Sequence, residues 1–223
     1  MMKELVKKIF FNTSKPNRIF SGVSSGMMTH YDPKDRAMHL LGLYEREIYT
    51  YLKKGMEGAE TLIDIGANDG YYGLAFVKQK GKEIILCEPG AERKALVENL
   101  KLNGCIEKTD FVLIDKFVSD FSGGNKISIN DLVKNKNKIF ILMDIEGAEQ
   151  KVVEGFDFRK NDQVIWLIET HALAIEERLI QLLETEGYHV FIIRNAWWRK
   201  FIPEKRPLAH NRWLYAEKSD RSD

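Results

Sequence analysis

The sequence contains 223 residues, of which 44% are hydrophobic, 30% are charged and only 5 are proline. This composition suits one ordinary domain with a real hydrophobic core, and it excludes a disordered chain, a collagen-like chain and a disulfide scaffold. The formal net charge is +1, so the overall charge does not indicate a nucleic-acid or membrane partner.

Residues 1–55 are predicted to form a helical or irregular extension that packs on the rest of the chain. Residues 5–10 place apolar side chains on one face of a short helix, which is expected to dock on the protein rather than on a membrane. The spacing of apolar residues predicts a longer helix over Leu40–Lys54, with Gly55 as its stop signal. Residues 56–223 are predicted to form the main folded body.

From Thr61 onward, short apolar runs alternate with amphipathic segments, which is typical of a buried parallel sheet with crossover helices. The predicted strands are Thr61–Ile65, Glu83–Cys87, Phe111–Ile114, Ile139–Met143, Val164–Ile168, His189–Ile193 and Trp213–Ala216. The predicted helices are Tyr72–Lys80, Ala91–Asn103, Glu149–Glu154 and Leu173–Glu186. A turn is expected at residues 121–125, which contain two adjacent glycines. This order predicts an α/β fold with a seven-stranded, mostly parallel sheet, helices on both faces and a C-terminal antiparallel hairpin.

Two cysteines and the lack of a long apolar stretch bear on the cellular setting. Cys87 and Cys105 are not spaced as zinc ligands, and they are expected to be reduced thiols. No stretch approaches the roughly 18 apolar residues that a membrane-spanning helix needs. The expectation is therefore a cytoplasmic protein with no membrane partner.

A parallel sheet binds its ligands at the carboxyl ends of the strands, and the first predicted strand is followed there by a glycine turn. The turn runs from Gly66 to Gly70 with the spacing G-x-x-x-G, not the G-x-G-x-x-G of dinucleotide-binding proteins. No G-K-[S/T] for a nucleoside triphosphate is present either. Asp64 before the turn would repel a phosphate but suits an amino group or a sulfonium. The alternative is a tight strand-to-helix turn without a ligand.

The second predicted strand ends in a carboxylate. Glu88 lies 18 residues after Gly70, and an acid at this strand tip is the standard acceptor for both hydroxyls of a ribose. Taken alone, Glu88 would be any surface acid, but its distance from the glycine turn favours the ribose ligand. The segment after the third predicted strand contains Ser119, at a position where an adenine edge is expected.

Acidic residues and one histidine follow the fourth and fifth predicted strands. The fourth strand is followed by three acids, Asp144, Glu146 and Glu149. Glu146 and Glu149 are explained by the preference of a helix N-terminus for negative charge, whereas Asp144 is not. The fifth strand is followed by Glu169 and His171, where the histidine is either a base in a ligand site or a cap on the next helix.

With these residues in place, the chain resembles the class I S-adenosylmethionine-dependent methyltransferases of the FkbM type, from about residue 40 to 216. The matching segments are G-L-Y-E (42–45), L-I-D-I-G-A-N-D-G-Y-Y (62–72), C-E-P (87–89) with Asn99 and Asn103, S-I-N-D-L (128–132), M-D-I-E-G-A-E (143–149), I-E-T-H (168–171) and N-R-W-L (211–214). Two departures stand out. Leu142 occupies a position where the family commonly has lysine, and the segment between Ser119 and Ser128 is shorter than usual.

The resemblance implies that residues 56–223 form a methyltransferase domain of Rossmann-like fold, with S-adenosylmethionine lying across the carboxyl edge of the sheet. Within it, residues 64–70 would shape the amino-acid end of the cofactor and Glu88 would hold the ribose. Characterised family members usually methylate hydroxyl oxygens of sugars or secondary metabolites, which implies a small-molecule acceptor. Carried over by position, the implied cofactor-binding residues are Asp64, Gly66, Asn68, Gly70, Tyr71, Glu88, Ser119 and Asp144.

Methyl transfer to an alcohol is an in-line displacement in which the reacting atoms are held about 3 Å apart, water is excluded and a base takes the hydroxyl proton. Asp144 and His171 are the candidate catalytic bases, and Glu169 would orient or charge the imidazole. Alternatively, Asp144, Glu169 and His171 hold a divalent metal, magnesium or manganese, that lowers the pKa of the alcohol.

Two further functions stay open at this stage. A protein on this scaffold can bind S-adenosylmethionine as a regulatory or interaction module without catalysis. The second is methylation of RNA or of a phosphorylated acceptor, because Trp197 and Trp198 lie among basic residues and would stack on a sugar or base, or else pack as a hairpin loop. No N-P-P-Y-like tetrapeptide follows the fourth strand, so a nucleic-acid partner is not favoured.

Overall fold

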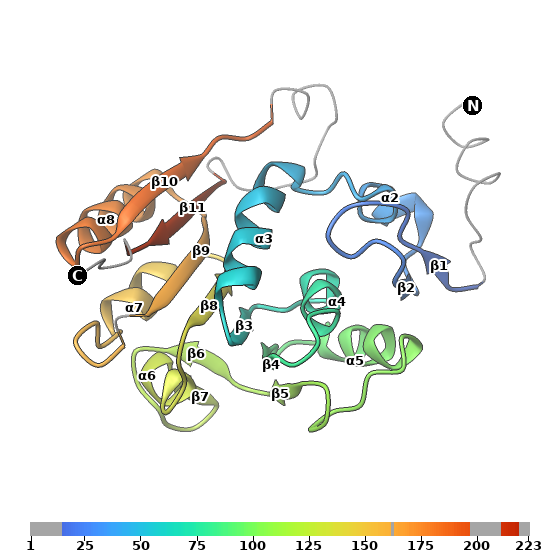
Figure 1. Cartoon of the computed structure of the whole chain (residues 1–223), viewed down its shortest axis with the longest axis horizontal. Helices are drawn as coiled ribbons and strands as arrows, with labels where there is room; N and C mark the ends of the chain where they lie inside the picture. Colours follow the sequence, from blue (N-terminus) through green and yellow to red (C-terminus); the bar gives the residue numbers. More distant parts are fainter. Residues whose placement is uncertain (1–14, 162, 197–210, 219–223) are drawn as a thin grey trace.

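The computed structural model describes residues 15–161, 163–196 and 211–218, which form an α/β fold around a seven-stranded sheet (Figure 1). The strand order is β10-β11-β9-β8-β3-β4-β5, and β11 runs antiparallel to both of its neighbours while β9, β8, β3, β4 and β5 are parallel. This confirms the predicted sheet and its C-terminal hairpin. The strands are β3 (Thr61–Ile65), β4 (Glu83–Cys87), β5 (Val112–Ile114), β8 (Ile139–Met143), β9 (Val164–Thr170), β10 (His189–Ile193) and β11 (Arg212–Glu217).

The order of the strands reverses at β3. The chain adds β4 and β5 on one side of β3 and then returns to add β8 and β9 on the other side. The carboxyl ends of β3 and β8 therefore diverge into loops that lead to opposite faces, and such a switch point is where α/β sheets bind ligands.

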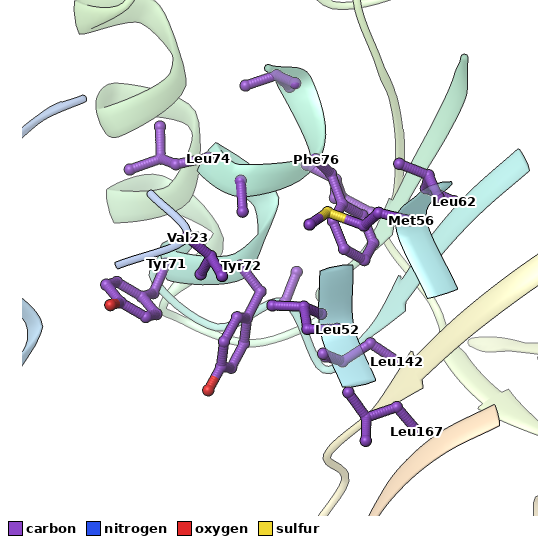
Figure 2. Packing of buried hydrophobic residues seen from close by; sticks show 14 of the residues in the cluster. Val23, Leu52, Met56, Leu62, Tyr71, Tyr72, Leu74, Phe76, Leu142 and Leu167 are labelled. Atoms are coloured by element: carbon purple, nitrogen blue, oxygen red, sulfur yellow. The ribbon is translucent and has the colours of Figure 1, made fainter. Parts of the chain in front are cut away.

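Helices cover both faces because the inner strands are apolar on both sides. In β3, Leu62 packs into a cluster with α3 (Tyr49–Gly58), α4 (Tyr71–Val77) and α5 (Arg93–Leu102) (Figure 2). The next residue, Ile63, packs into a second cluster with α6 (Ile129–Val133), α7 (Glu149–Glu154) and α8 (Leu173–Thr185). Alternate residues of each strand therefore belong to different cores.

The N-terminal segment departs from the single helix that the sequence predicts. The chain forms β1 (Asn17–Arg18), β2 (Met28–Thr29), α2 (Pro33–Leu41) and a 3-10 turn η1 (Arg46–Ile48) before α3. Gly42 ends α2 in a left-handed conformation and its N–H bonds to the carbonyl of His39. Gly55 does not stop a helix but lies inside α3, where a Cβ would come within 2.4 Å of the Phe140 ring. It is a close-packing site rather than a stop signal.

Asn99 of α5 and Asn103, which caps the C-terminus of α5, hold the N-terminal segment against the rest of the fold. The Asn103 amide accepts a hydrogen bond from the Met28 N–H and donates one to the Met28 carbonyl, both at 2.8 Å. The Asn99 amide accepts from the His30 N–H at 2.9 Å and donates to the carbonyl of Asp69 at 2.8 Å. Asn99 thus links the N-terminal segment to the glycine turn.

The crossover between β5 and β8 contains elements that the sequence did not predict. Two short parallel strands, β6 (Phe117–Ser119) and β7 (Lys126–Ser128), pair with each other outside the main sheet, and Ser128 caps α6. The predicted turn lies between them. The predicted helix at residues 5–10 and the Trp197–Trp198 loop lie outside the described residues. Among the residues that are described, no helix has both the length and the apolar character needed to cross a bilayer.

Candidate functional site

The glycine turn after β3 is held in place by backbone hydrogen bonds to both neighbouring strands. The N–H groups of Gly66 and Ala67 donate to the Cys87 carbonyl at 3.0 Å, and the Asp144 N–H donates to the Ile65 carbonyl at 2.9 Å. Gly66 has a φ of +86°, and a Cβ there would lie 1.9 Å from the backbone oxygen of Asp144. No side chain fits at this position, because the turn and the end of β8 are in direct contact.

Glu88 is buried at the tip of β4 and connects two loops. One carboxylate oxygen accepts from the Asn68 N–H at 2.9 Å and the other accepts from the Gly90 N–H at 2.6 Å. Asn68 itself has a left-handed φ of +48°, which this bond helps to hold. A carboxylate oxygen accepts two hydrogen bonds, so each keeps the capacity to accept one from a ligand hydroxyl. Glu88 therefore shapes the turn as well as offering the predicted ribose contact.

Asp64 is a fully buried carboxylate whose two oxygens have no hydrogen-bond partner among the described residues. Burial raises the pKa of Asp64 well above its usual range, and the nearby carboxylates of Asp144 and Glu88 raise it further. In the sheet register Asp64 lies beside Leu142, the position where the family commonly has lysine. An apolar neighbour leaves the carboxylate without a charged partner, so the site is one that a cationic group would fill.

The ends of β8 and β9 bring the other predicted site residues together. The His171 Nε2 atom lies 3.3 Å from Asp144 Oδ1 and 3.6 Å from Glu169 Oε2. One ligand atom from each of the three residues falls within 4.8 Å of the others. Only Asp144 is reachable from solvent, since its side chain is 31% exposed while those of His171 and Glu169 are 4% and 2% exposed.

Glu149 is a site residue that the sequence analysis assigned only to the start of a helix. It is the first residue of α7, but its side chain is fully buried and Oε1 contacts both the Gly147 N–H and His171 Nδ1. Burial lowers the pKa of His171, but its contacts with Asp144, Glu149 and Glu169 outweigh burial and raise the pKa to about 12. The signal available in the sequence was the pattern D-x-E-G-A-E. A favourable charge at a helix N-terminus does not explain why the Glu149 side chain is buried.

Two further predicted cofactor residues, Tyr71 and Ser119, hydrogen-bond to neighbouring side chains of the fold. Tyr71 begins α4 and is buried in an aromatic cluster, where its hydroxyl hydrogen-bonds with that of Tyr49 at 2.6 Å. Figure 2 shows Tyr71 and Tyr72 in this buried region. Burial raises the pKa of Tyr71. Ser119 lies at the end of β6, outside the main sheet, and its hydroxyl donates to Asp120 at 2.8 Å.

A further buried carboxylate, Glu45, was not singled out from the sequence, although its segment carried part of the resemblance. Glu45 has a left-handed φ of +45°, is 1% exposed and accepts a hydrogen bond from the Tyr72 hydroxyl at 2.6 Å. The Tyr72 ring packs edge-on against Trp213, which pairs with Glu169 in the sheet register. A chain of buried contacts thus connects the N-terminal segment with the end of β9.

In fold, the chain is similar to solved methyltransferase structures. It matches the methyltransferase FkbM of Methylobacillus flagellatus at a TM-score of 0.56 and 18% identity over 71% of this chain, and it spans 44% of that protein. It matches the precorrin-6y C5,15-methyltransferase of Geobacter metallireducens at 0.53 and 16% identity, covering 78% of this chain and 88% of that one. An rRNA methylase of Streptococcus thermophilus matches at 0.51 and 11% identity, covering 78% and 97%.

These similarities show a Rossmann-like methyltransferase fold, and at such identities they show the fold alone. No protein-family model and no curated protein sequence matches the chain. The solved structures carry names that refer to different acceptors, among them a precorrin and an rRNA. The fold therefore does not select an acceptor, and the site has to be judged on its own residues.

Proposed function

We propose that this protein transfers a methyl group from S-adenosylmethionine to a hydroxyl oxygen of a sugar or another small metabolite. The observation that carries the proposal is Asp64, a buried carboxylate with no partner among the described residues, next to the glycine turn at the switch point of the sheet. S-adenosylmethionine brings two positive groups, an amino group and a sulfonium. A buried anion that lacks a cation fits such a ligand better than it fits a phosphate.

The residues of this edge fit the remaining parts of the cofactor. Gly66 lets the ligand approach the backbone, because the turn carries no side chain there. Glu88 has acceptor capacity left for the ribose hydroxyls after its bonds to Asn68 and Gly90. When bound, the cofactor supplies an electrophilic methyl group. We assign its amino-acid end to Asp64 and its ribose to Glu88.

In the proposed reaction, the C–S bond to the methyl group breaks while a C–O bond to the acceptor forms. The hydroxyl proton passes to Asp144, and no group is oxidised or reduced. His171 is excluded as the acceptor of this proton while its flanking carboxylates keep the imidazole doubly protonated. Asp144 is the exposed member of the cluster, and Oδ1 faces His171, so Oδ2 is the oxygen left for the substrate proton.

The small-molecule acceptor is favoured by the resemblance to the FkbM type and by the acidic character of the edge. Asp64, Glu88, Asp144, Glu169 and Glu149 all lie at this edge, and such a concentration of negative charge repels a phosphate backbone. A polyol or sugar has no charge to be repelled and offers hydroxyl groups to these acceptors.

The test is a turnover assay that measures S-adenosylhomocysteine with a panel of sugars, polyhydroxylated metabolites and RNA. We expect turnover with a hydroxylated small molecule, and at least a 100-fold lower kcat for Asp144→Asn, because a general base contributes about two to four orders of magnitude. The control is Glu146→Gln, which removes an exposed acid from the same loop. Turnover with RNA alone would contradict the acceptor class, and cofactor binding without turnover on any acceptor would favour a regulatory protein.

A further inference from the structure

We propose that Asp144, Glu169 and His171 bind a divalent cation, with Mn²⁺ as the best-matched ion, at the acceptor side of this edge. The catalytic part of this inference rests on the proposed function, because the cation would sit where the acceptor hydroxyl has to lie. The binding part does not, since an ion can be measured without a cofactor or an acceptor.

The distances suit three ligands of one ion. Ligand atoms about 2.1 Å from a six-coordinate ion lie about 3 Å from each other at right angles and about 4.2 Å apart across the ion. The separations from His171 Nε2 are 3.3 Å to Asp144 and 3.6 Å to Glu169, and all three ligand atoms lie within 4.8 Å. Small side-chain movements bring such a triangle around an ion.

Glu149 fixes the side of the imidazole that faces the cluster. Its Oε1 accepts a hydrogen bond from His171 Nδ1, so that nitrogen carries a proton and Nε2 points between Asp144 and Glu169. This is the arrangement in which a second carboxylate orients a histidine ligand toward a metal. Nε2 thus faces one carboxylate oxygen of Asp144 at 3.3 Å and one of Glu169 at 3.6 Å, which is a position that suits a cation.

The balance of charge favours the metal ion. Three acidic side chains, Asp144, Glu149 and Glu169, converge on one histidine, and all but Asp144 are buried. A divalent cation offsets more of this acidic excess than a single positive charge does. A separate observation points the same way. Oε2 of Glu149 is buried without a partner among the described residues, so the acidic excess is not met from within the described fold.

The donor set selects among ions. Ca²⁺ prefers six to eight oxygens at longer distances, whereas one imidazole nitrogen and two carboxylate oxygens suit a smaller ion. Mn²⁺ accepts carboxylate ligands and remains compatible with an imidazole nitrogen, while Mg²⁺ prefers oxygen alone. The partly exposed Asp144 side opens toward solvent. Coordination there of the acceptor hydroxyl would lower its pKa, and Oδ2 of Asp144 would take the proton released.

The experiment is titration of Mn²⁺ into the purified full chain, followed by the loss of the free Mn²⁺ signal in electron paramagnetic resonance. We expect one saturable site, with binding at least tenfold weaker in Glu169→Gln and in His171→Gln. Glu149→Gln should weaken binding by roughly 10- to 100-fold through the orientation of the imidazole. Glu146→Gln is the matched control, because this acid is exposed in the same loop, and it should bind as the wild type does.

Calorimetric binding of S-adenosylmethionine to each variant shows whether the variant is folded and still binds the cofactor. This measurement distinguishes a failure of the cation site from a failure of the proposed function. Cofactor binding together with no saturable Mn²⁺ site in the wild type would overturn the cation site and leave the proposed function standing. A saturable Mn²⁺ site that Glu169→Gln, His171→Gln and Glu149→Gln all retain would also overturn the proposal, because the ion would then lie elsewhere. Mn²⁺ binding without cofactor binding would retain the cation site and contradict the proposed function.

Discussion

The two halves of the proposed ligand-binding edge are built in different ways. The proposed cofactor half, residues 64–70 with Glu88, is set by hydrogen bonds of backbone N–H groups and by Gly66, where no side chain fits. The acidic half, Asp144, Glu149, Glu169 and His171, is set by side chains from separate elements. A backbone-built half is rigid before any ligand arrives, whereas a half built from like charges depends on which cation it holds.

The largest expected dependence on pH concerns the charge of His171. Its pKa in the folded protein is about 12, above the ordinary value of 6.5, so the stability it contributes is complete below pH 6.5 and declines as the pH rises toward 12. With a chelator present, the difference in unfolding free energy between the wild type and His171→Gln should shrink by up to about 1.4 kcal/mol per pH unit between pH 7 and 9. Urea unfolding measures it, and a constant difference would contradict the cationic imidazole.

The second effect tests the rigidity of the cofactor half. Gly66→Ala places a Cβ within 1.9 Å of the Asp144 backbone oxygen, so the turn has to separate from β8. We expect a loss of about 3 kcal/mol or more in unfolding free energy. Gly81→Ala is the matched control, since Gly81 has a similar φ of +79° with open space around it, and only about 1 kcal/mol should be lost. Equal losses in thermal or urea unfolding would mean that the contact with β8 is unimportant.

The third effect concerns Asp64, whose replacement should increase stability and weaken binding of S-adenosylmethionine. A carboxyl whose pKa is raised in the folded state costs stability above its unfolded pKa, so Asp64→Asn should gain about 1–2 kcal/mol at pH 7 and less at pH 4. The same change should weaken binding of S-adenosylmethionine at least tenfold. Asp69→Asn is the contrasting variant, because Asp69 is paired with Tyr31 and Arg36 and its loss should destabilise. A destabilised Asp64→Asn would contradict the unpartnered carboxylate.

The smallest effect is a difference in cofactor binding between variants of Asn99, in α5, and of Asn103, which caps α5. Asn99→Ala loses two and Asn103→Ala loses three side-chain hydrogen bonds to the backbone, and each variant should lose about 1–2 kcal/mol of stability. Only Asn99 bonds to the glycine turn, through the Asp69 carbonyl, so only its variant should also bind S-adenosylmethionine more weakly. Urea unfolding and calorimetry on both variants check this prediction. Equal cofactor affinities would show that the bond from Asn99 to the glycine turn does not affect cofactor binding.

The contrast between the halves also explains what the sequence could predict. β3, β4 and β8 have the predicted bounds, because buried parallel strands appear as continuous apolar runs. β10 also has its predicted bounds, although it is an edge strand that pairs antiparallel with β11. The turn at Gly66 and the position of Glu88 at the tip of β4 were predictable because both depend on local spacing. Gly55 was misjudged because its close approach to Phe140 is a tertiary contact. Glu149 and Glu45 were missed for the same reason, since their partners His171 and Tyr72 are separated from them by 22 and 27 residues.

The central claim, that the cofactor half binds S-adenosylmethionine, is tested most directly by calorimetric titration of that molecule into the wild type, Glu88→Ala and Glu92→Ala. Glu92 is an exposed acid on the same segment whose side chain makes no capping bond to α5. We predict binding to the wild type and to Glu92→Ala, and a loss of at least about 1.4 kcal/mol, a tenfold change, for Glu88→Ala. No binding to well-folded wild-type protein would contradict the claim and leave the glycine turn as a structural feature only.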